Sequence, residues 1–390
     1  MIDWIVVGGG PHGVHIATRL RSQLGIPASQ LRIVDPEPRL LRRWTTNTER
    51  TGMRHLRSPA VHHLDISPFS LRNHVGRRRR AELLLGPYER PTLQLFNRHC
   101  EAVIAGAHLA SCHVVARAQA IDLRADEVEV HTTVGSLRAR KAVLALSACE
   151  QPAWPAWALQ LAKQAPSRVV HVFGDPYPLP GPGAALRVTV VGGGITAAQT
   201  AMRLAREGHT PVTLISRHDL REHQFDSDPG WIGPKFMSRF SKEPDLAERR
   251  RLIREARHRG SMPTDVLKAL RTGMKEGRIL WRRGEVQAAH LEGPTGLVLK
   301  ADTFSHTTDH VILATGFRPE RPGSALVEQL VKTANLPCAP CGYPVVDPQL
   351  RWHSRLHVTG ALAELELGPT ARNLVGARAA GERIVRAEAA

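Results

Sequence analysis

The 390-residue sequence lacks a long hydrophobic run. No apolar stretch approaches the roughly 18 residues from which a membrane-spanning helix is recognised. The first four residues, Met1 to Trp4, lead directly into an apolar segment and show no signal-peptide pattern. We therefore expect a soluble, cytoplasmic protein that has no membrane partner.

Cysteine is scarce. The five cysteines, at positions 100, 112, 149, 338 and 341, are too few for the disulfide framework of a secreted domain. Cys338-Ala339-Pro340-Cys341 has the spacing of a redox dithiol, which would indicate a disulfide reductase. Prolines at 337, 340 and 344 surround the pair, and no second pair of ligands is visible. We therefore favour neither catalysis nor metal binding there, and we expect no metal site.

Acidic and aromatic residues are also few. The sequence holds 36 Asp and Glu against 53 Lys and Arg, which gives a net charge of +17, and only 5% of its residues are aromatic. The arginines are scattered, with one run at Arg77-Arg78-Arg79-Arg80, and no nucleic-acid-binding motif is present. We therefore expect no nucleic-acid partner, and interpret the charge as hydrating the surface and attracting anionic cofactors. With 42% hydrophobic residues, the chain is predicted to form two or three globular domains.

The most informative pattern lies at the N-terminus. Apolar Ile5-Val6-Val7 runs into Gly8-Gly9-Gly10-Pro11-His12-Gly13, and a helical pattern follows. In this strand–turn–helix fingerprint the three spaced glycines allow the turn, the approach of a pyrophosphate, and close packing of helix on strand. The pyrophosphate meets backbone N–H groups at the positive end of the helix. We expect Gly10→Val to abolish nucleotide binding and to destabilise the fold.

An acidic residue supports this interpretation. The apolar strand Leu31-Arg32-Ile33-Val34 ends in Asp35, about 20 positions after the last glycine, where a carboxylate accepts hydrogen bonds from an adenosine ribose. The alternative, a glycine-rich loop beside an unrelated surface aspartate, does not account for the spacing. We expect this site to bind FAD.

The same signal occurs a second time. Apolar residues 188–191 lead into Gly192-Gly193-Gly194-Ile195-Thr196-Ala197, and the next strand ends in Ser216-Arg217-His218 with no acid. An acid would repel a ribose 2′-phosphate, whereas a hydroxyl and a guanidinium would bind it. We therefore expect NADPH rather than NADH, held by Gly192, Gly194, Ala197, Ser216 and Arg217. The alternative is that Arg217 is an ordinary surface arginine.

The two halves of the chain have the same order of elements. Each has a fingerprint unit, a hairpin, and a closing apolar strand, at 142–146 and at 310–314. A last strand at 356–358 precedes a glycine and a helical segment, and would join the first sheet. Residues 59–91 show no period and are expected to be irregular with short helices. The predicted fold is therefore α/β, with two Rossmann-like domains and the second inserted in the first: FAD-binding 1–158, NADPH-binding 159–320, and FAD-binding again 321–390.

Together these residues carry a family resemblance. The two fingerprints, the strand end Ala314-Thr315-Gly316 and the final strand–Gly–helix resemble the flavoproteins with two dinucleotide-binding domains. Gly52-Met53 and Leu56-Arg57-Ser58-Pro59, downstream of Trp44, resemble flavin-containing monooxygenases, and most closely the N-hydroxylating group of ornithine and lysine N-monooxygenases. The resemblance covers most of the chain.

The resemblance implies roles for individual residues. The FAD contacts it implies are Gly8, Gly10, Pro11, His12, Gly13 and Asp35, with Trp44, Gly360 and Gly368 close to the flavin, and Gly316 is a further cofactor contact at its strand end. Some positions depart from the pattern: residues 145–147 are Ala-Leu-Ser rather than Ala-Thr-Gly, and Ala361 replaces the aspartate of many disulfide reductases. Around His171 the monooxygenase signature is degenerate, because Ala165 and Ser167 stand in place of its Phe and Gly. This departure weakens the case for an enzyme that oxygenates carbonyl compounds.

The resulting hypothesis is an FAD- and NADPH-dependent monooxygenase. It would use O₂ to oxygenate a nucleophilic N or S of a small substrate through a C4a-hydroperoxyflavin. One alternative is an NADPH-dependent flavin reductase that passes electrons to a small acceptor or a partner protein, and another is a flavin-binding sensor without turnover. We assign no catalytic residue; His171 and Asp226 are candidates for which a structural hydrogen bond is the favoured role. Substrate and oligomeric state do not follow from the sequence.

Overall fold

The computed structural model describes residues 1–179, 181, 186–209, 211–293 and 296–389. Its largest sheet is built around β1 (Ile2–Val7), which pairs in parallel with β2 (Leu31–Asp35) and β8 (Gly135–Leu144). The strand order is β19-β20-β8-β1-β2-β5, and the antiparallel β6 and β7 join through β8. The remaining strands of this sheet are β5 (His113–Val115), β6 (Ala118–Leu123), β7 (Val128–Thr132), β19 (Arg351–His353) and β20 (Leu356–Val358).

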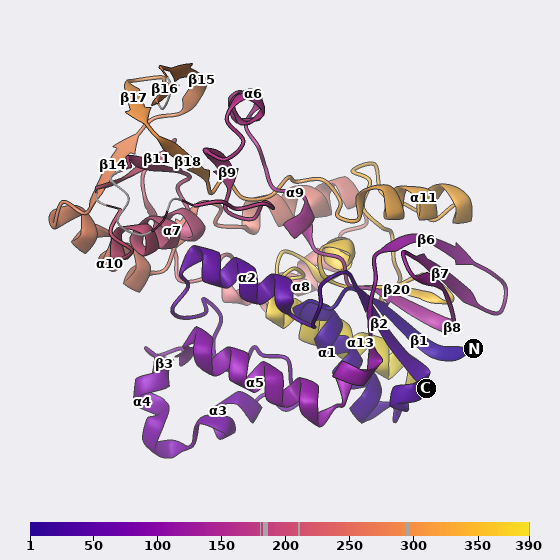
Figure 1. Ribbon diagram of the computed structural model, residues 1–390. Helices are drawn as coiled ribbons and strands as arrows, with labels where there is room; N and C mark the ends of the chain where they lie inside the picture. The colour runs from indigo at the N-terminus through magenta and orange to yellow at the C-terminus, as the bar shows by residue number, and fades with distance from the viewer. Residues whose placement is uncertain (180, 182–185, 210, 294–295, 390) are drawn as a thin grey trace.

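A second, wholly parallel sheet has the order β14-β11-β10-β18-β9. Its strands are β9 (Val169–His171), β10 (Val188–Val191), β11 (Val212–Ser216), β14 (Ile279–Arg283) and β18 (His310–Leu313). A three-stranded antiparallel sheet of β15 (Val286–Glu292), β16 (Gly296–Ala301) and β17 (Ser305–Thr308) extends from it (Figure 1). Short two-residue strands complete the list: β3 (Leu84–Leu85), β4 (Arg90–Pro91), β12 (Arg221–Glu222) and β13 (Ser261–Met262).

Two separate parts of the chain, one N-terminal and one C-terminal, form the first sheet. β20, near the C-terminus, pairs in parallel with β8, so the chain returns to the first sheet after completing the second. This confirms the predicted α/β class with one Rossmann-like unit nested in the other. The exact boundaries at 158/159 and 320/321 stay a prediction; α6 (Ala156–Gln164) crosses the first of them and packs against β9 and β15 of the second unit.

Helices cover the sheets. The α-helices not yet mentioned are α1 (Pro11–Gln23), α2 (Arg42–Thr51), α3 (Ser70–Val75), α4 (Arg80–Leu83), α5 (Leu93–Gly106), α7 (Ile195–Arg206), α8 (Pro234–Phe240), α9 (Leu246–Ala256), α10 (Thr264–Lys275), α11 (Ser324–Ala334), α12 (Glu364–Leu367) and α13 (Leu374–Ala389). Short α3, α4, β3 and β4 occupy the aperiodic segment 59–91, as expected. Among the described residues, no helix combines the length and apolar character needed to cross a membrane.

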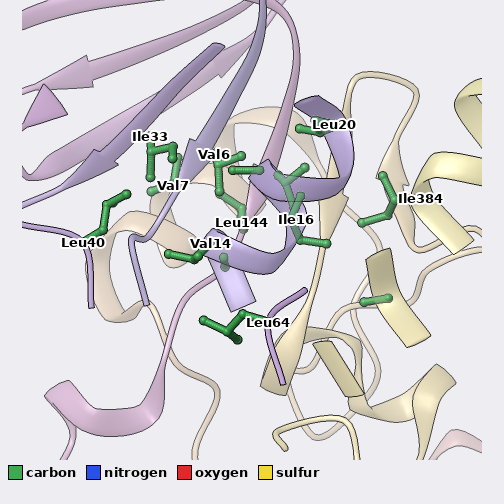
Figure 2. Packing of buried hydrophobic residues seen from close by; sticks show 14 of the residues in the cluster. Val6, Val7, Val14, Ile16, Leu20, Ile33, Leu40, Leu64, Leu144 and Ile384 are labelled. Atoms are coloured by element: carbon green, nitrogen blue, oxygen red, sulfur yellow. The ribbon is translucent and has the colours of Figure 1, made fainter. Parts of the chain in front are cut away.

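The main core surrounds α1. This helix packs between β1 and the C-terminal α13, and Val14, Ile16 and Leu20 on it are almost wholly buried (Figure 2). They meet Val6 of β1 and Ile384 of α13, so residues from the two ends of the chain share one core. Each such side chain contributes about 1.5–3 kcal/mol by leaving water. This packing fixes the N-terminal end of α1 against the ends of β1 and β20, where the first candidate site lies.

Candidate nucleotide and flavin site

The first glycine loop connects β1 to α1 and is constrained by backbone contacts at both ends. Gly8 has φ +115°, and a Cβ built there would lie 2.5 Å from the carbonyl oxygen of Ala145. A Cβ on Gly13 would lie only 1.7 Å from the carbonyl oxygen of Gly8. Both positions therefore need glycine for the fold itself, because a side chain would collide with main-chain atoms.

Gly10 differs from its two neighbours in the fingerprint. It caps the N-terminus of α1 with φ −76° and ψ −174°, values that any residue adopts, and a Cβ there would meet no atom within 4 Å. The expectation that Gly10→Val destabilises the fold therefore finds no steric support, since no atom of the described residues lies within 4 Å of a Cβ at Gly10. Pro11 occupies the first turn of the helix, where its missing N–H costs nothing. A free helix N-terminus beside open space is the geometry that holds a phosphate.

Asp35 lies beside this loop, as its position predicted. One carboxylate oxygen accepts a hydrogen bond from the Gly9 N–H at 2.6 Å, and the other accepts from the Glu37 N–H at 2.9 Å. The carboxylate therefore holds the end of β2 against the glycine loop. Each carboxylate oxygen has more than one lone pair, so these bonds leave capacity for ribose hydroxyls.

His12 joins the glycine loop to the C-terminal segment. Its Nδ1 lies 3.0 Å from Thr359 Oγ1, and a Cβ on Gly360, whose φ is +65°, would approach this ring to 3.5 Å. Burial lowers the pKa of His12 to about 4, opposed by backbone contacts with Arg372 and Asn373. The ring is therefore neutral at pH 7. His12 and Gly360, 348 positions apart, are brought into one place as the resemblance implied.

Two other residues implied by the resemblance, Trp44 and Gly368, have protein partners of their own. Trp44 is half-buried on α2; its Nε1 donates to Asn97 Oδ1 at 3.1 Å, and its ring lies 5.4 Å from that of Phe96. Gly368 has φ +74°, and a Cβ there would come within 3.0 Å of Met237 Sδ on α8. Gly368 is thus needed for its turn and its packing, and a flavin contact at Trp44 or Gly368 stays a prediction.

The second glycine loop resembles the first in its backbone conformation but has different neighbours. Gly192 has φ +153° and would place a Cβ 2.4 Å from Ala314 O, and Ala197 is buried beneath it. Gly194 caps α7, but a Cβ on it would lie 3.3 Å from the Cα of Gly260. The segment around Gly260 therefore covers the side that is open at Gly10. A pyrophosphate that used this loop in the same manner would require that segment to move.

The end of β11 only partly matches the expected phosphate clamp. Ser216 is buried; its hydroxyl donates to the His218 carbonyl at 2.8 Å and accepts from Trp281 Nε1 at 2.8 Å. A hydroxyl engaged in this way does not reach a 2′-phosphate, so the predicted Ser216 contact loses its support. Arg217 has a side chain 72% exposed and lies 3.8 Å from Glu285, a weak ion pair that a phosphate can displace.

The links between the two sheets involve Gly316 and His171. The Gly316 carbonyl accepts from Ala153 N at 2.9 Å, where two connecting segments cross. His171, at the end of β9, is buried; its Nδ1 accepts from Phe173 N at 3.1 Å, and burial lowers its pKa to about 4. These contacts agree with the structural role that the sequence favoured for His171. That role and a cofactor contact at Gly316 stay predictions.

A histidine and two carboxylates elsewhere gather on β6 and β7. Asp122, Glu129 and His131 bring their ligand atoms within 4.8 Å of one another, the spacing of a metal site. However, His131 Nε2 already bonds Asp122 at 2.8 Å, and Glu129 is paired with Arg124 and with Arg138. These partners satisfy the group without an ion, so we assign no metal to it.

The sequence and the fold were compared with those of known proteins. A family model described as FAD-NAD(P)-binding matches residues 5–148, which include the first glycine loop and Asp35. No curated protein sequence gives a significant match. Among solved structures, the chain is similar to ornithine hydroxylase PvdA from Pseudomonas aeruginosa, with 21% identity, a TM-score of 0.76, and coverage of 99% of this chain and 98% of that one.

Two further structures show the range of chemistry on this fold. Ornithine N-hydroxylase KtzI from Kutzneria sp. 744, described with reduced FAD, NADP⁺ and L-ornithine, has 18% identity and a TM-score of 0.76 over 99% of this chain and 98% of that one. Bacillithiol disulfide reductase from Staphylococcus aureus has 14% identity and a TM-score of 0.65 over 99% and 98%. At these identities the likeness establishes the fold, and it agrees with the resemblance seen in the motifs.

Sequence reasoning missed a set of contacts that joins the two units. Arg57 donates to the carbonyls of three consecutive residues, 223–225, at 2.7–3.0 Å, and to Ser261 Oγ at 3.0 Å. Asp226, the next residue, bonds Arg257 at 3.1 Å and Asn373 Nδ2 at 3.0 Å. The Leu56-Arg57-Ser58-Pro59 motif and the candidate Asp226 pointed to this region, but not to these contacts. The contacts place the segment 220–262 beside the C-terminal segment and near His12.

A buried charged network lies behind these contacts. Glu364 on α12 is 1% exposed and pairs with Arg250 of α9 and, at 2.6 Å, with Arg372. Arg372 also donates to Tyr343 Oη at 2.7 Å, and the Arg250 guanidinium lies 4.1 Å from the centre of the Tyr343 ring. Because removal of one partner leaves a buried charge unpaired, this network fixes the C-terminal segment against the inserted unit.

Proposed function

We propose that the protein is an FAD- and NADPH-dependent oxidoreductase that uses O₂ to oxygenate a nucleophilic N or S of a small substrate. The observation that carries the proposal is the first glycine loop, where a free helix N-terminus and open space at Gly10 lie beside Asp35. The second glycine loop supplies a place for a reducing coenzyme. The likeness in fold to enzymes described as ornithine hydroxylases supports an oxygenating rather than a purely reducing function.

The residues at the first site fit FAD. The backbone N–H groups that follow Gly10 would hold the pyrophosphate, and Asp35 would accept hydrogen bonds from the adenosine ribose. The contact between His12 and Thr359 lies at the neighbouring strand end, where the flavin ring would continue. Trp44 and Gly368 are proposed to line the flavin, and their present partners, Asn97 and Met237, would then form its second layer of contacts.

The second site is proposed to hold NADPH. Gly192, Gly194 and Ala197 would accommodate its pyrophosphate after the segment around Gly260 moves away. Arg217 would exchange its exposed partner Glu285 for the 2′-phosphate. Charge-assisted hydrogen bonds to a phosphate are stronger than such a surface ion pair, which makes this exchange favourable.

Bound flavin would supply the redox chemistry, taking a hydride from NADPH and activating oxygen. The chain would position the reactants and exclude water. His12, neutral at pH 7 because of burial, keeps the glycine loop and the C-terminal segment together without adding a charge next to the flavin. The polar group of Asp226, Arg257 and Asn373 lies at the junction of the two units and would contribute to the wall of the reaction site.

Three further assignments belong to this proposal. The division into residues 1–158, 159–320 and 321–390 is proposed to separate FAD-binding from NADPH-binding functions. The partners are proposed to be a small-molecule substrate and O₂. A cytoplasmic location is proposed from the low cysteine content of the sequence.

Steady-state turnover tests the proposal. A panel of primary amines, amino acids and thioethers is added to protein, FAD, NADPH and air, and NADPH oxidation, peroxide and product mass are measured. The proposal requires a substrate that accelerates NADPH oxidation, lowers the peroxide yield and gains one oxygen atom. NADPH consumption coupled only to reduction of an added acceptor would indicate the flavin reductase instead, and the absence of any NADPH consumption would indicate a flavin-binding sensor.

A further inference from the structure

The segment Cys338-Ala339-Pro340-Cys341-Gly342 forms a tight turn that neither glycine loop uses. Gly342 N donates to Ala339 O at 2.8 Å, and Ala339 N donates to Tyr343 O at 2.9 Å. The backbones of Cys338 and Pro344 pair as an isolated antiparallel β-bridge. Gly342 has φ +80°, which lets the chain reverse. Disulfides need Cα atoms within roughly 7 Å, and a reversal within this segment favours such an approach for two cysteines three positions apart.

None of the other three cysteines has a second cysteine within three positions of it in the sequence. All five are free thiols in this structure. Cys100 and Cys112 are buried, and burial raises the pKa of both thiols. Cys149 is half-buried, and burial also raises its pKa. Cys338 and Cys341 are likewise half-buried, and they lie only three positions apart in the sequence.

A guanidinium lies against one member of the pair. Arg321 Nη1 is 3.8 Å from Cys338 Sγ and donates to the Gly342 carbonyl at 3.0 Å, while Nη2 bonds Glu328 at 2.8 Å. Burial raises the pKa of Cys338, and Arg321 opposes this by stabilising the thiolate. The pKa of Cys338 stays above its ordinary value, and Arg321 is the fixed cationic neighbour of its sulfur when the thiolate forms.

The turn also touches the buried network near the first site. Tyr343, which follows Gly342, accepts a hydrogen bond from Arg372, and Arg372 with Asn373 forms the backbone beside His12. The turn therefore contacts the segment that packs on the glycine loop through the side chains of Tyr343 and Arg372.

We propose that Cys338 and Cys341 are a redox-active dithiol that hydrogen peroxide converts into an intramolecular disulfide. The Cys338 thiolate attacks one peroxide oxygen: an S–O bond forms, the O–O bond breaks, and the departing hydroxide takes a proton to become water. The Cys341 thiolate then attacks the Cys338 sulfur: an S–S bond forms, the S–O bond breaks, and a second water leaves. Two thiols lose two electrons and two protons, and one peroxide becomes two waters. The source of peroxide rests on the proposed function, since reduced flavin and O₂ release it when substrate is absent.

Added peroxide tests the dithiol without any assumption about function. The full-length protein, freed of reductant, is treated with hydrogen peroxide, then denatured, and its thiols are counted and its peptides mapped by mass. We expect two thiols to be lost, a mass lower by about 2 Da in the peptide that holds both cysteines, and full recovery with dithiothreitol. In Cys341→Ser, Cys338 should accumulate as a sulfenic acid that dimedone traps. Cys149→Ser is the matched control and should behave like wild type.

Two results would overturn the dithiol: unchanged thiols in the peptide 338–341, or a disulfide that joins other cysteines. A separate arm supplies NADPH in air without substrate, with and without catalase. Formation of the same disulfide, blocked by catalase, is expected. If added peroxide closes the disulfide but NADPH in air does not, the proposed flavin function fails and the dithiol stands; if added peroxide does not close it, the dithiol fails irrespective of the flavin.

Discussion

A substitution at Gly10 is expected to affect nucleotide binding much more than folding. In Gly10→Val the new side chain enters space that holds no protein atom within 4 Å of the Cβ position, and the backbone angles suit valine. The expected folding cost is that of a poorer helix N-cap, about 1 kcal/mol, which corresponds to a fall in melting temperature of about 2–4 °C. The same side chain fills the place of the pyrophosphate.

The expected loss of binding is much larger. Hydrogen bonds to charged groups contribute about 1.5–3 kcal/mol each, so losing two weakens FAD binding by about 3–6 kcal/mol, or about 10²- to 10⁴-fold in Kd. The assay is fluorescence titration of FAD into apoprotein, with thermal unfolding of the apoproteins alongside. Gly13→Ala is the control: its Cβ would lie 1.7 Å from Gly8 O, so it should lose folding stability itself. A folded Gly10→Val protein that binds FAD like wild type would refute the assignment of this loop.

The remaining predictions concern coenzyme choice, the junction of the two units, and pH. Wild type should prefer NADPH over NADH by about 10- to 100-fold in kcat/KM. Arg217→Ala should lose most of this preference because its KM for NADPH rises, while its kcat/KM for NADH is nearly unchanged. Ser216→Ala, measured at the same ionic strength, should keep the preference because that hydroxyl is engaged by His218 and Trp281. If Arg217→Ala keeps the preference, the phosphate clamp lies elsewhere. Arg57→Met should lower the free energy of unfolding by about 2–4 kcal/mol, measured by urea titration, because three carbonyls and Ser261 lose their donor; unchanged stability would mean that water replaces these bonds at no cost. Burial lowers the pKa of His63 to about 3 and those of His99 and His171 to about 4. Histidine in an unfolded chain has a pKa near 6.5, so between pH about 6.5 and 4 the unfolded chain binds more protons than the folded one, and stability falls as pH falls. His99→Gln should therefore make the melting temperature depend less steeply on pH. An unchanged slope would contradict the burial argument.

The sequence predicted the parts of the fold that depend on local pattern. Gly8 and Gly13 are needed by the backbone itself, so their spacing identified the loop and the strand and helix on either side. The apolar runs predicted as strands at 142–146 and 310–314 contain the buried end of β8 and all of β18, because both faces of a parallel sheet are usually covered. The return of β20 to the first sheet was predicted from the strand, glycine and helical segment near the C-terminus.

Contacts between distant segments were beyond reach of the sequence. The Arg57 side chain bonds carbonyls about 170 positions away, and backbone carbonyls carry no signature in sequence. Ser216 matched the composition of a phosphate clamp, but whether its hydroxyl faces solvent or Trp281 depends on how β14 packs beside β11. The cover over Gly194 by Gly260 likewise arises from a loop whose path is set by tertiary packing.

The most direct test of the central claim is anaerobic mixing of the FAD-loaded protein with NADPH in a stopped-flow spectrometer, followed by a second mixing with oxygenated buffer. If FAD and NADPH are the cofactors, NADPH should bleach the visible absorbance band of the flavin faster than an equal concentration of NADH does, and oxygen should restore this band through a transient absorbance. A flavin band that NADPH leaves unchanged, in protein that carries one FAD per chain, would contradict the central claim.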